Sequence, residues 1–565
     1  MQKKKAKAAE EKRVRPGFFP DRMVHVLLIL LIGTIAYSNS FSVPFQWDDL
    51  TYIGENPIIK QLHYFIQPSE AQGLQFYHHV FQRYVTYLSF ALNYALHGYK
   101  VMGYHILNLA VHLINALLVY LLISLTFRTP VLGASAMKDK ADFAALFSAL
   151  LFVSHPLQTM AVTYIYQRLA SLVTLFYLLS LVSYIQSRLS QKTMQRGLFY
   201  GISFLSAVLA MKSKENAFTL PLAIALFEFF FFSGEMKKRV LQLIPFVLTL
   251  LVIPLSLSGG EGSDNARIHL DRHVTSEAYF FTQMRVLVMY LRLLFFPARQ
   301  SVLYDISASH SFFELNVVLS FLFLLGIFCL GVFLFFRSRT GRPEFRIIAF
   351  GIFWFFLTNA VESSFIPLLL IQEYRMYLPS VGLFMSIATG TFLLFQQSRS
   401  IQKVALVVVL AVPLVLTVVT YARNTVWQTR LGLWEDVVSR APNNPIANFN
   451  LGVAYTENRL IDESKIYYEK ALMLNPDYPR AYNNLGCYYG QRGNPDKAIE
   501  LLNQAVQKDP YLAIAHYNLG LAYIMKRQLD EAEVQLTAAL KLNPGLQGAQ
   551  KILTRIEQKR RSVGR

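Results

Sequence analysis

The chain has 565 residues, of which 54% are hydrophobic and only 16% are Asp, Glu, Lys or Arg. Soluble globular proteins carry charge on about a quarter of their residues, so this composition excludes an ordinary soluble protein and predicts one that folds largely in a bilayer. The formal net charge of +19 is not accompanied by an RRM, zinc-finger or helix-turn-helix pattern. We therefore expect no nucleic-acid partner and attribute the excess of cations to membrane topology.

The N-terminal leader, residues 1–22, is basic and precedes the first apolar run. This arrangement predicts a cytoplasmic N-terminus. Since no small-residue cleavage site follows the run, we expect it to stay as an anchor. The chain has no Asn-x-Ser/Thr sequence, which favours a bacterial envelope over a secretory lumen. The expected location is the inner (cytoplasmic) membrane of a bacterium.

Residues 23–421 are expected to form an all-α transmembrane domain with about eleven helices. The apolar segments lie near 23–40, 104–127, 142–155, 168–187, 197–211, 217–233, 240–257, 314–336, 347–361, 378–396 and 403–421. Every connection that this order places in the cytoplasm contains Lys or Arg, as the positive-inside rule requires. The odd number of crossings places the rest of the chain in the periplasm. The segments near 142 and 197 are shorter than the roughly 20 residues of a full span, so we expect tilted or broken helices buried among others.

Two outer loops, residues 41–103 and 258–313, are long enough to be structured. The second contains the amphipathic stretch TQMRVLVMYLRLLFFP, which we interpret as a helix that lies at the outer surface. An additional crossing at this point would spoil the charge pattern of the connections.

After Tyr421 the composition changes and residues recur every 34 positions. The recurring residues are Gly452, Gly486 and Gly520, then Tyr455, Tyr489 and Tyr523, then Ala471, Ala505 and Ala539, and then Pro476, Pro510 and Pro544. This is the period and pattern of tetratricopeptide repeats. We expect a partial leading repeat over 422–444, three full repeats over 445–546 and a basic capping helix over 547–565, which together make a protein-binding α-solenoid.

Charged residues also gather in the segments that the topology places outside. They are Asp48 and Asp49 in FQWDD, Arg83, His155 in FVSHPLQT, Arg168, Lys214 and Glu215 in MKSKEN, Glu362, and Glu373 and Arg375 in QEYRM. Because charge near a bilayer is costly, residues that persist on one face are candidates for function.

Several sequence blocks follow one another in a specific order: WDD, RYVTYLSFALNYALHGYKVMGYHILNLAVHLINALL, LFVSHPLQTMAVTYIYQRLASL, KSKENAFTLP, EYRMYLPSVG and RNTVWQ, then the repeats. With these blocks the chain resembles the TMTC family, the transmembrane and tetratricopeptide-repeat O-mannosyltransferases, in a bacterial version. The resemblance covers nearly the whole chain and implies a GT-C-like fold. The chain departs from the family at residues 372–376, where QEYRM replaces a tighter Ala-Glu-Arg motif, and in its short repeat array.

The resemblance implies a membrane glycosyltransferase that moves a sugar, mannose in the family, from a polyprenyl phosphate to a hydroxyl on the outer face. The lipid-linked sugar is then a co-substrate, and the acceptor is protein Ser or Thr that the repeats capture. Two other classes remain open, a ligase or transporter of lipid-linked glycans and a non-catalytic assembly scaffold. A transporter would need inverted repeats and mid-membrane charges, neither of which is visible, and a scaffold has no need of paired aspartates.

The resemblance places Asp48 and Asp49 at the catalytic position, although adjacent aspartates can also simply cap a helix. One carboxylate would take the acceptor proton, and we favour Asp49 as this base. The departing phosphate needs fixed cations. Arg375 is the first candidate, because a guanidinium can bind phosphate in bidentate fashion. The other candidates are Lys214, Arg168 and Arg83, and for each the alternative is snorkelling to the interface.

Supporting roles are expected for Glu215, His155, Glu362, Glu373 and Tyr377. His155 is equally suited to order a broken helix end before Pro156, and Glu362 is better suited to pair with an arginine than to catalyse. His105 and His112 lie on an apolar helix, where core packing is the simpler interpretation. No cluster has metal-ligand spacing, and the sequence does not decide whether a divalent metal is required.

An asparagine ladder runs along the repeats. Asn450, Asn484 and Asn518 stand immediately before each Leu-Gly, 34 residues apart, on the helices that line the concave face of such arrays. A carboxamide can pair with both the N–H and the C=O of an extended peptide, so we expect these residues to bind the acceptor. Ordinary repeat consensus is the alternative.

Overall fold

The computed structural model describes residues 21–133, 135–257, 274–395 and 399–563. Within these ranges the chain is helical and contains no strand, as the sequence predicts. Most of the basic leader and residues 258–273 of the second outer loop lie outside the described residues. The chain divides into two compact units, residues 1–300 with 306–428 and residues 429–565 with 301–305.

Each of the eleven apolar segments contains a helix. These are α2 (Asp21–Tyr37), α6 (Val101–Thr126), α7 (Ala141–Ser154), α9 (Arg168–Leu189), α10 (Thr193–Met211), α11 (Leu220–Phe231), α12 (Met236–Leu248) with η8 (Thr249–Leu251) and α13 (Val252–Leu257), α15 (Leu315–Arg337), α16 (Phe345–Asn359), α17 (Pro379–Phe395) and α18 (Arg399–Thr425). By length and composition, six helices in the described ranges could cross a membrane, or seven if one bent pair is a single span. The number eleven therefore stays a prediction.

The two short segments behave differently. The segment near 142 breaks after α7, where His155 and Pro156 lead into η5 (Pro156–Gln158) and α8 (Thr159–Val162) with a bend of 52°. This confirms the predicted broken helix, because Pro156 has no N–H to continue the helical ladder. The segment near 197 is instead one unbroken helix of 19 residues, α10, whose buried residues are confined to its second half. The expected burial among other helices is wrong there, and of the two predicted forms, tilted or broken, the broken one is excluded.

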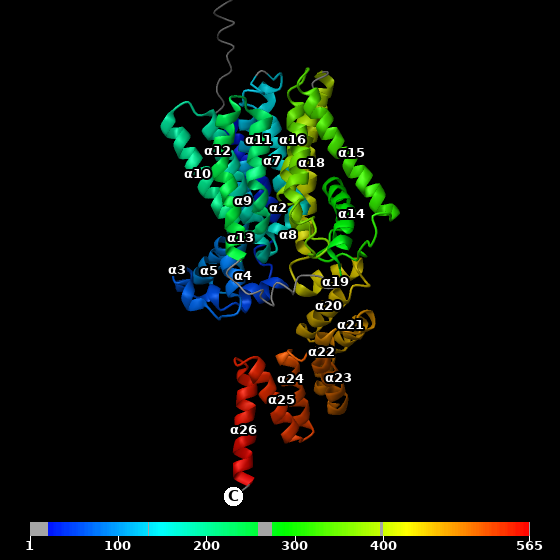
Figure 1. Ribbon diagram of the computed structural model, residues 1–565. Helices are drawn as coiled ribbons and strands as arrows, with labels where there is room; N and C mark the ends of the chain where they lie inside the picture. Colours follow the sequence, from blue (N-terminus) through cyan, green and yellow to red (C-terminus); the bar gives the residue numbers. More distant parts are fainter. Residues whose placement is uncertain (1–20, 134, 258–273, 396–398, 564–565) are drawn as a thin grey trace, which may run out of the picture. The chain divides into compact units, whose positions relative to one another are not determined.

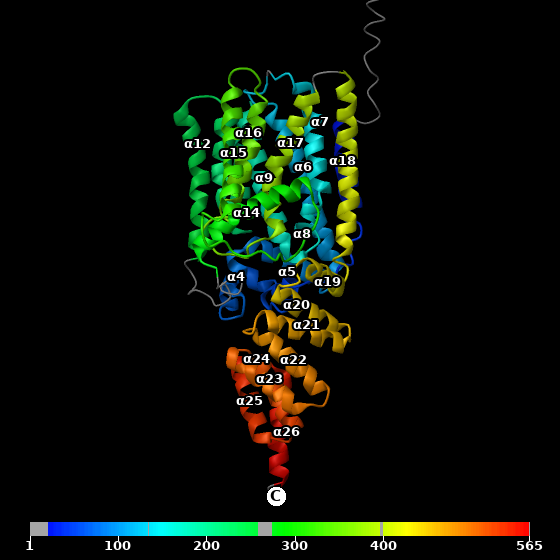
Figure 2. The same ribbon diagram turned by 90° about the vertical axis from the view of Figure 1, so that its right-hand side faces the viewer.

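The helices connect at two opposite ends of the bundle. Figures 1 and 2 show the connections α6–α7, α9–α10, α11–α12 and α15–α16 at one end, which we call the basic end. These connections carry the cations of residues 128–140, 188–196, 237–239 and 337–346. The first outer loop packs at the other end, and its elements are η1 (Leu50–Gly54), η2 (Ile58–Lys60), α3 (His63–Ile66), η3 (Pro68–Ala71), α4 (Tyr77–Gln82) and α5 (Tyr84–His97).

The amphipathic stretch of the second outer loop forms α14 (Ser276–Phe295), as the sequence predicts. The helix is long and apolar enough to count among the candidate spans, and half of its apolar window is buried. Its buried face holds the connection between α16 and α17. The Tyr279 hydroxyl donates to the carbonyl of Glu362 (2.6 Å), and the Tyr290 hydroxyl donates to that of Gln372 (2.9 Å).

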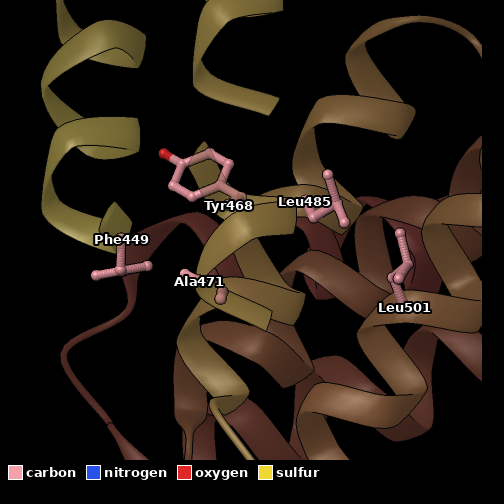
Figure 3. Packing of buried hydrophobic residues seen from close by; sticks show 6 residues of the cluster. Phe449, Tyr468, Ala471, Leu485 and Leu501 are labelled. Atoms are coloured by element: carbon pink, nitrogen blue, oxygen red, sulfur yellow. The ribbon is translucent and has the colours of Figure 1, made fainter. Parts of the chain in front are cut away.

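The second unit is the repeat array. A single helix, α19 (Arg430–Arg440), precedes three helix pairs and a last helix: α20 (Pro445–Glu457) with α21 (Ile461–Leu474), α22 (Pro479–Gln491) with α23 (Pro495–Lys508), α24 (Ala513–Met525) with α25 (Leu529–Leu542), and α26 (Gln547–Val563). Figure 3 shows Phe449, Tyr468 and Leu485 packed between neighbouring helices. Each helix pair matches one predicted repeat.

Candidate functional site

A cavity of about 260 Å³ opens among the connections at the end of the bundle opposite the basic end. Five separate parts of the chain line it: the Trp-Asp-Asp segment, Arg83 between α4 and α5, the segment that leads into α9, the Lys-Glu-Asn segment after α10, and the connection from α16 to α17. The charged side chains that line it are Asp48, Arg83, Lys214, Glu215, Glu362 and Arg375. Six of the predicted site residues thus come together, although they lie up to 327 residues apart in the sequence.

The two aspartates have different environments. Asp49 is 1% exposed, and both of its oxygens accept backbone hydrogen bonds, from the N–H of Gln46 (2.8 Å) and from that of Tyr166 (2.6 Å). Burial raises the pKa of Asp49, although these two N–H groups oppose the shift. Asp48 is half-buried and lines the cavity, whereas Asp49 does not. The geometry therefore favours Asp48 over Asp49 for contact with a substrate.

The backbone before Asp48 is held in an unusual conformation. Trp47 has a φ of 35°, in a region that a large side chain rarely adopts and that occurs where surrounding contacts impose it. The Tyr164 hydroxyl supplies one such contact by accepting the N–H of Asp48 (2.9 Å). Asp49 supplies another by joining this segment to Tyr166. Asp48 is thereby positioned at the cavity wall.

Arg375 is a buried cation whose hydrogen bonds are incomplete. The residue is 4% exposed, and its Nη1 donates to the Tyr279 hydroxyl (3.3 Å). Its Nε has no hydrogen-bond partner, and in the described part of the chain no carboxylate lies within ion-pair distance of its guanidinium. A buried guanidinium with an unmet donor is suited to an anionic ligand, because such a ligand would supply the missing acceptors.

Lys214 has a carboxylate partner in the same cavity. Its Nζ donates to Oε1 of Glu362 (2.5 Å) and lies 4.7 Å from the centre of the Tyr374 ring. Glu362 thus forms an ion pair, but the predicted arginine partner is wrong, because the partner is Lys214. Because Lys214 is paired with Glu362, Arg375 is the less completely hydrogen-bonded of these two cations.

Arg83 and Glu215 form a second ion pair at the cavity. Arg83 Nε donates to Oε1 of Glu215 (2.8 Å) and Nη2 donates to Oε2 (3.2 Å), so the pair is bidentate. Burial alone would raise the pKa of Glu215, but the charge and hydrogen bonds of Arg83 outweigh it and lower the pKa to about 2. Glu215 is thus ionised at neutral pH and holds Arg83 at the wall.

Besides Asp49, four further predicted site residues of the membrane unit do not line the cavity. Arg168 is fully buried, and its guanidinium donates to Asn108, to Ser89 and to the carbonyl of Tyr104. His155 accepts the N–H of Leu157 with Nδ1 and contacts the carbonyl of Leu294 with Nε2, so it orders the helix break. Glu373 accepts from Gln300, and the Tyr377 hydroxyl contacts His112 and Asn115. These four side chains stabilise the helices and connections around the cavity.

Several lining residues escaped the sequence analysis because they carry no charge. Tyr164, Tyr166 and Tyr374 supply aromatic wall, and Ile366, Leu368 and Leu369 supply apolar wall next to Arg375. In the sequence, their position near the charged motifs could have identified them as lining residues. The described residues contain no group of three His, Cys, Asp or Glu side chains that could hold a metal ion.

The side-chain amides of the asparagine ladder already make hydrogen bonds within the repeats. Asn450 donates to the carbonyl of Ile446 in its own helix, Asn484 donates to the Tyr468 hydroxyl (3.3 Å), and Asn518 donates to Oδ1 of Asn483 (2.9 Å). Asn484 and Asn518 also line two small cavities between neighbouring repeats, of about 150 and 200 Å³. All three side chains are half-buried, so these asparagines contribute to repeat packing.

Comparison with known proteins agrees with this architecture. Tetratricopeptide-repeat models match residues 446–478 and 483–546. Over 466 residues the chain is 26% identical to the protein O-mannosyl-transferase F38B6.6 of Caenorhabditis elegans, a match that covers 80% of this chain and 63% of that protein. It is 25% identical over 478 residues to the human protein O-mannosyl-transferase TMTC4, a match that covers 75% of this chain and 63% of that protein.

Other matches cover less of the chain. The human protein O-mannosyl-transferase TMTC3 is 30% identical over 175 residues, which is 29% of this chain and 17% of that protein. Among solved structures, MamA matches 23% of this chain and 76% of its own, with 23% identity and a TM-score of 0.22. The chain spans less than two thirds of the length of the worm and human TMTC4 relatives. The resemblance to TMTC proteins is thereby confirmed.

The Arg83–Glu215 pair generates a prediction about pH. Because the folded pKa of Glu215 lies below its ordinary value of 4.5, the pair stabilises the fold above that value, and this contribution is lost as the pH falls toward 2. We expect Glu215→Gln to lower the thermal midpoint of the detergent-purified protein at neutral pH. The difference from wild type should shrink as the pH falls below about 4.5. Differential scanning fluorimetry across this range measures it.

Glu277→Gln is the matched control, because Glu277 is an exposed carboxyl in the first turn of α14 at the same end of the bundle. Its midpoint should follow that of wild type at every pH. A Glu215→Gln deficit that stays constant down to pH 2 would contradict an ionised pair and indicate a packing defect.

Proposed function

We propose that this TMTC-like chain is a membrane glycosyltransferase. It transfers a sugar, mannose by analogy with the named relatives, from a polyprenyl-phosphate donor to a Ser or Thr hydroxyl of a protein. The observation that carries the proposal is one cavity that holds a half-buried carboxylate, Asp48, together with an incompletely satisfied guanidinium, Arg375. A transfer that releases a phosphate from an attacked sugar needs both groups.

The charges suit the chemistry of such a transfer. The acceptor hydroxyl forms a bond to the anomeric carbon as the bond from that carbon to the phosphate oxygen breaks, and the configuration inverts. Asp48 takes the hydroxyl proton, and the electron pair leaves with the polyprenyl phosphate. Arg375 and Lys214 face the negative charge that develops on this leaving group. The apolar wall of Ile366, Leu368 and Leu369 suits the first isoprene units of the donor.

The preference for Asp48 as the base revises the choice made from sequence. Asp49 has no free oxygen, because both accept backbone N–H groups. A carboxylate in that position orients the loop, and its burial away from the cavity keeps an acceptor hydroxyl from reaching it. We assign Asp49 to positioning and Asp48 to proton transfer.

The outer face of the membrane is the proposed place of reaction. The connections at the basic end carry the clustered cations, and the positive-inside rule assigns such an end to the cytoplasm. The cavity lies among the connections at the other end of the bundle. A GT-C-like enzyme that uses lipid-linked donors on the outer leaflet fits this orientation, and for a bacterium the acceptor then lies in the periplasm.

We expect substitutions of the two aspartates to differ in their effects on activity and on the thermal midpoint. Asp48→Asn preserves shape but removes the base, so we expect transfer to fall about 10²- to 10⁴-fold with little change in thermal midpoint. Asp49→Asn replaces one acceptor oxygen by an NH2 group that faces a backbone N–H, so we expect a lower midpoint together with lost activity. Transfer of sugar from a purified lipid-linked donor, measured beside the melting curve, distinguishes them. Full activity of Asp48→Asn would reject the mechanism.

Arg375 should govern use of the donor. Arg375→Ala should raise the donor concentration needed for half-maximal rate, and Arg375→Lys should recover only part of the loss, because an ammonium cannot make the forked contact. Arg292→Ala is the matched control, since Arg292 is an exposed cation on α14 outside the cavity. If both Arg375 variants match Arg292→Ala across a donor titration, Arg375 is structural.

We propose further that the repeats hold the acceptor protein, with Asn484 and Asn518 as the contacts because they line cavities between repeats. The double variant Asn484→Ala with Asn518→Ala should lose activity on a full-length protein acceptor and keep it on a short peptide. Asn450→Ala is the matched control, since Asn450 bonds only within its own helix. Equal activity of the folded double variant on both acceptors would leave the ladder as repeat consensus.

A further inference from the structure

A second cavity, of about 310 Å³, lies at the basic end of the bundle. It is formed by the start of α2, the last turns of α6 and α9, and the first half of α10. Its lining residues are Arg22, Tyr120, Leu121, Ser124, Leu125, Arg128, Val182, Ser183, Gln186 and Phe199. None of them lines the cavity assigned to sugar transfer, so the second cavity is not part of that site.

The polar groups of the second cavity include donors that the protein does not use. Arg22 is engaged, because its Nε donates to Oδ2 of Asp142 (3.0 Å), and the other oxygen of Asp142 accepts from Ser124 (3.1 Å). The guanidinium of Arg128 forms no ion pair within the described ranges of the chain. The side chains of Ser183 and Gln186, one turn apart on α9, likewise make no hydrogen bond to a described residue. The wall therefore offers one unpaired cation and two uncharged polar groups.

The remaining wall is apolar and continues onto the outside of the bundle. Leu125, Val182 and Phe199 line the cavity, and Leu121 at its edge is 43% exposed. From Leu121 an exposed apolar stripe runs along α6 through Ile114 and Ile106, which are 45% and 50% exposed. In a bundle of this composition such a stripe faces acyl chains. A ligand with a polar head in the cavity would thus have its apolar part beside α6.

We propose that this cavity binds the phosphate headgroup of an anionic glycerophospholipid from the leaflet at the basic end. Arg128 binds the phosphate by a charge-assisted, forked contact, and Arg22, whose charge Asp142 already pairs, lines the cavity beside it. Ser183 and Gln186 bind the glycerol hydroxyls of the headgroup, and an acyl chain lies along the α6 stripe. Basic pockets between membrane helices on the cytoplasmic side commonly bind such lipids. A soluble phosphate would use the same cations but not the stripe.

The test uses the full chain, purified in a zwitterionic detergent, with the thermal midpoint followed during lipid titration. A ligand that binds only the folded state raises the midpoint with its concentration, from which an apparent Kd follows. Phosphatidylglycerol is the probe, phosphatidylcholine tests the need for net charge, and glycerol 1-phosphate tests a soluble source. We expect phosphatidylglycerol alone to raise the midpoint at low micromolar to millimolar concentrations.

The variants separate a built site from general attraction to a basic surface. Arg128→Gln should weaken binding of phosphatidylglycerol about tenfold or more, as the loss of a charge-assisted contact predicts. Arg196→Gln removes an exposed cation from the same end outside the cavity, and it should bind as wild type does. Gln186→Met, which keeps the side-chain volume, should weaken binding of phosphatidylglycerol by a smaller factor. This variant provides the test of the site if Arg128→Gln does not fold.

Several outcomes would overturn the proposal. Equal weakening by Arg128→Gln and Arg196→Gln would mean diffuse electrostatic attraction. Equal stabilisation by phosphatidylcholine would remove the role of the headgroup charge, and full stabilisation by glycerol 1-phosphate would identify a soluble ligand instead. Unchanged binding in both Arg128→Gln and Gln186→Met would place the lipid elsewhere. Because the readout is binding, failure here is independent of sugar transfer.

Discussion

The constraint on which this structure depends is the high cost of an uncompensated charge away from water. In the membrane unit, charged side chains are therefore paired, hydrogen-bonded or placed at the ends of helices. Glu228 shows the rule in its strictest form: it is fully buried, its carboxylate accepts from Arg188, Arg239 and Tyr184, and these contacts join α9, α11 and α12. Breaking such a buried group apart usually costs several kcal/mol, of the order of 3–5.

The same constraint makes the exceptions informative. A cation that is buried but lacks a full set of acceptors is expensive, and it persists where a ligand completes it. Arg375 has this character at one end of the bundle, next to a carboxylate held at the cavity wall. Arg168, by contrast, is equally enclosed but is surrounded by carbonyl and amide oxygens. Two arginines that look alike in sequence thus differ in their hydrogen bonding, since Arg375 keeps an unmet Nε donor and Arg168 donates to three different residues.

The paired aspartates have different environments, and these suit the two different tasks that we propose for them. A base must keep a lone pair free for the acceptor proton, whereas a residue that positions a loop must use its lone pairs on backbone N–H groups. Asp49 joins segments 117 residues apart through backbone N–H groups, and Asp48 is the one of the two that lines the cavity. The helix α9 lines both cavities, with Leu169 near its start in the first and Val182, Ser183 and Gln186 near its end in the second.

The sequence by itself determined the helical class, the positions of the apolar segments, the break before Pro156 and the repeat boundaries, because composition, charge and period are local properties of the chain. It also selected six charged residues that the fold brings to one cavity, since charge beside a bilayer is rare enough to stand out. Which of Asp48 and Asp49 faces the cavity, and which of Arg168 and Arg375 keeps an unmet donor, were decided only by tertiary structure. The reason is physical: the function of a polar side chain depends on which partners occupy its hydrogen-bonding groups, and those partners come from Gln46, Tyr166, Ser89 and Tyr279, residues that only the fold brings near.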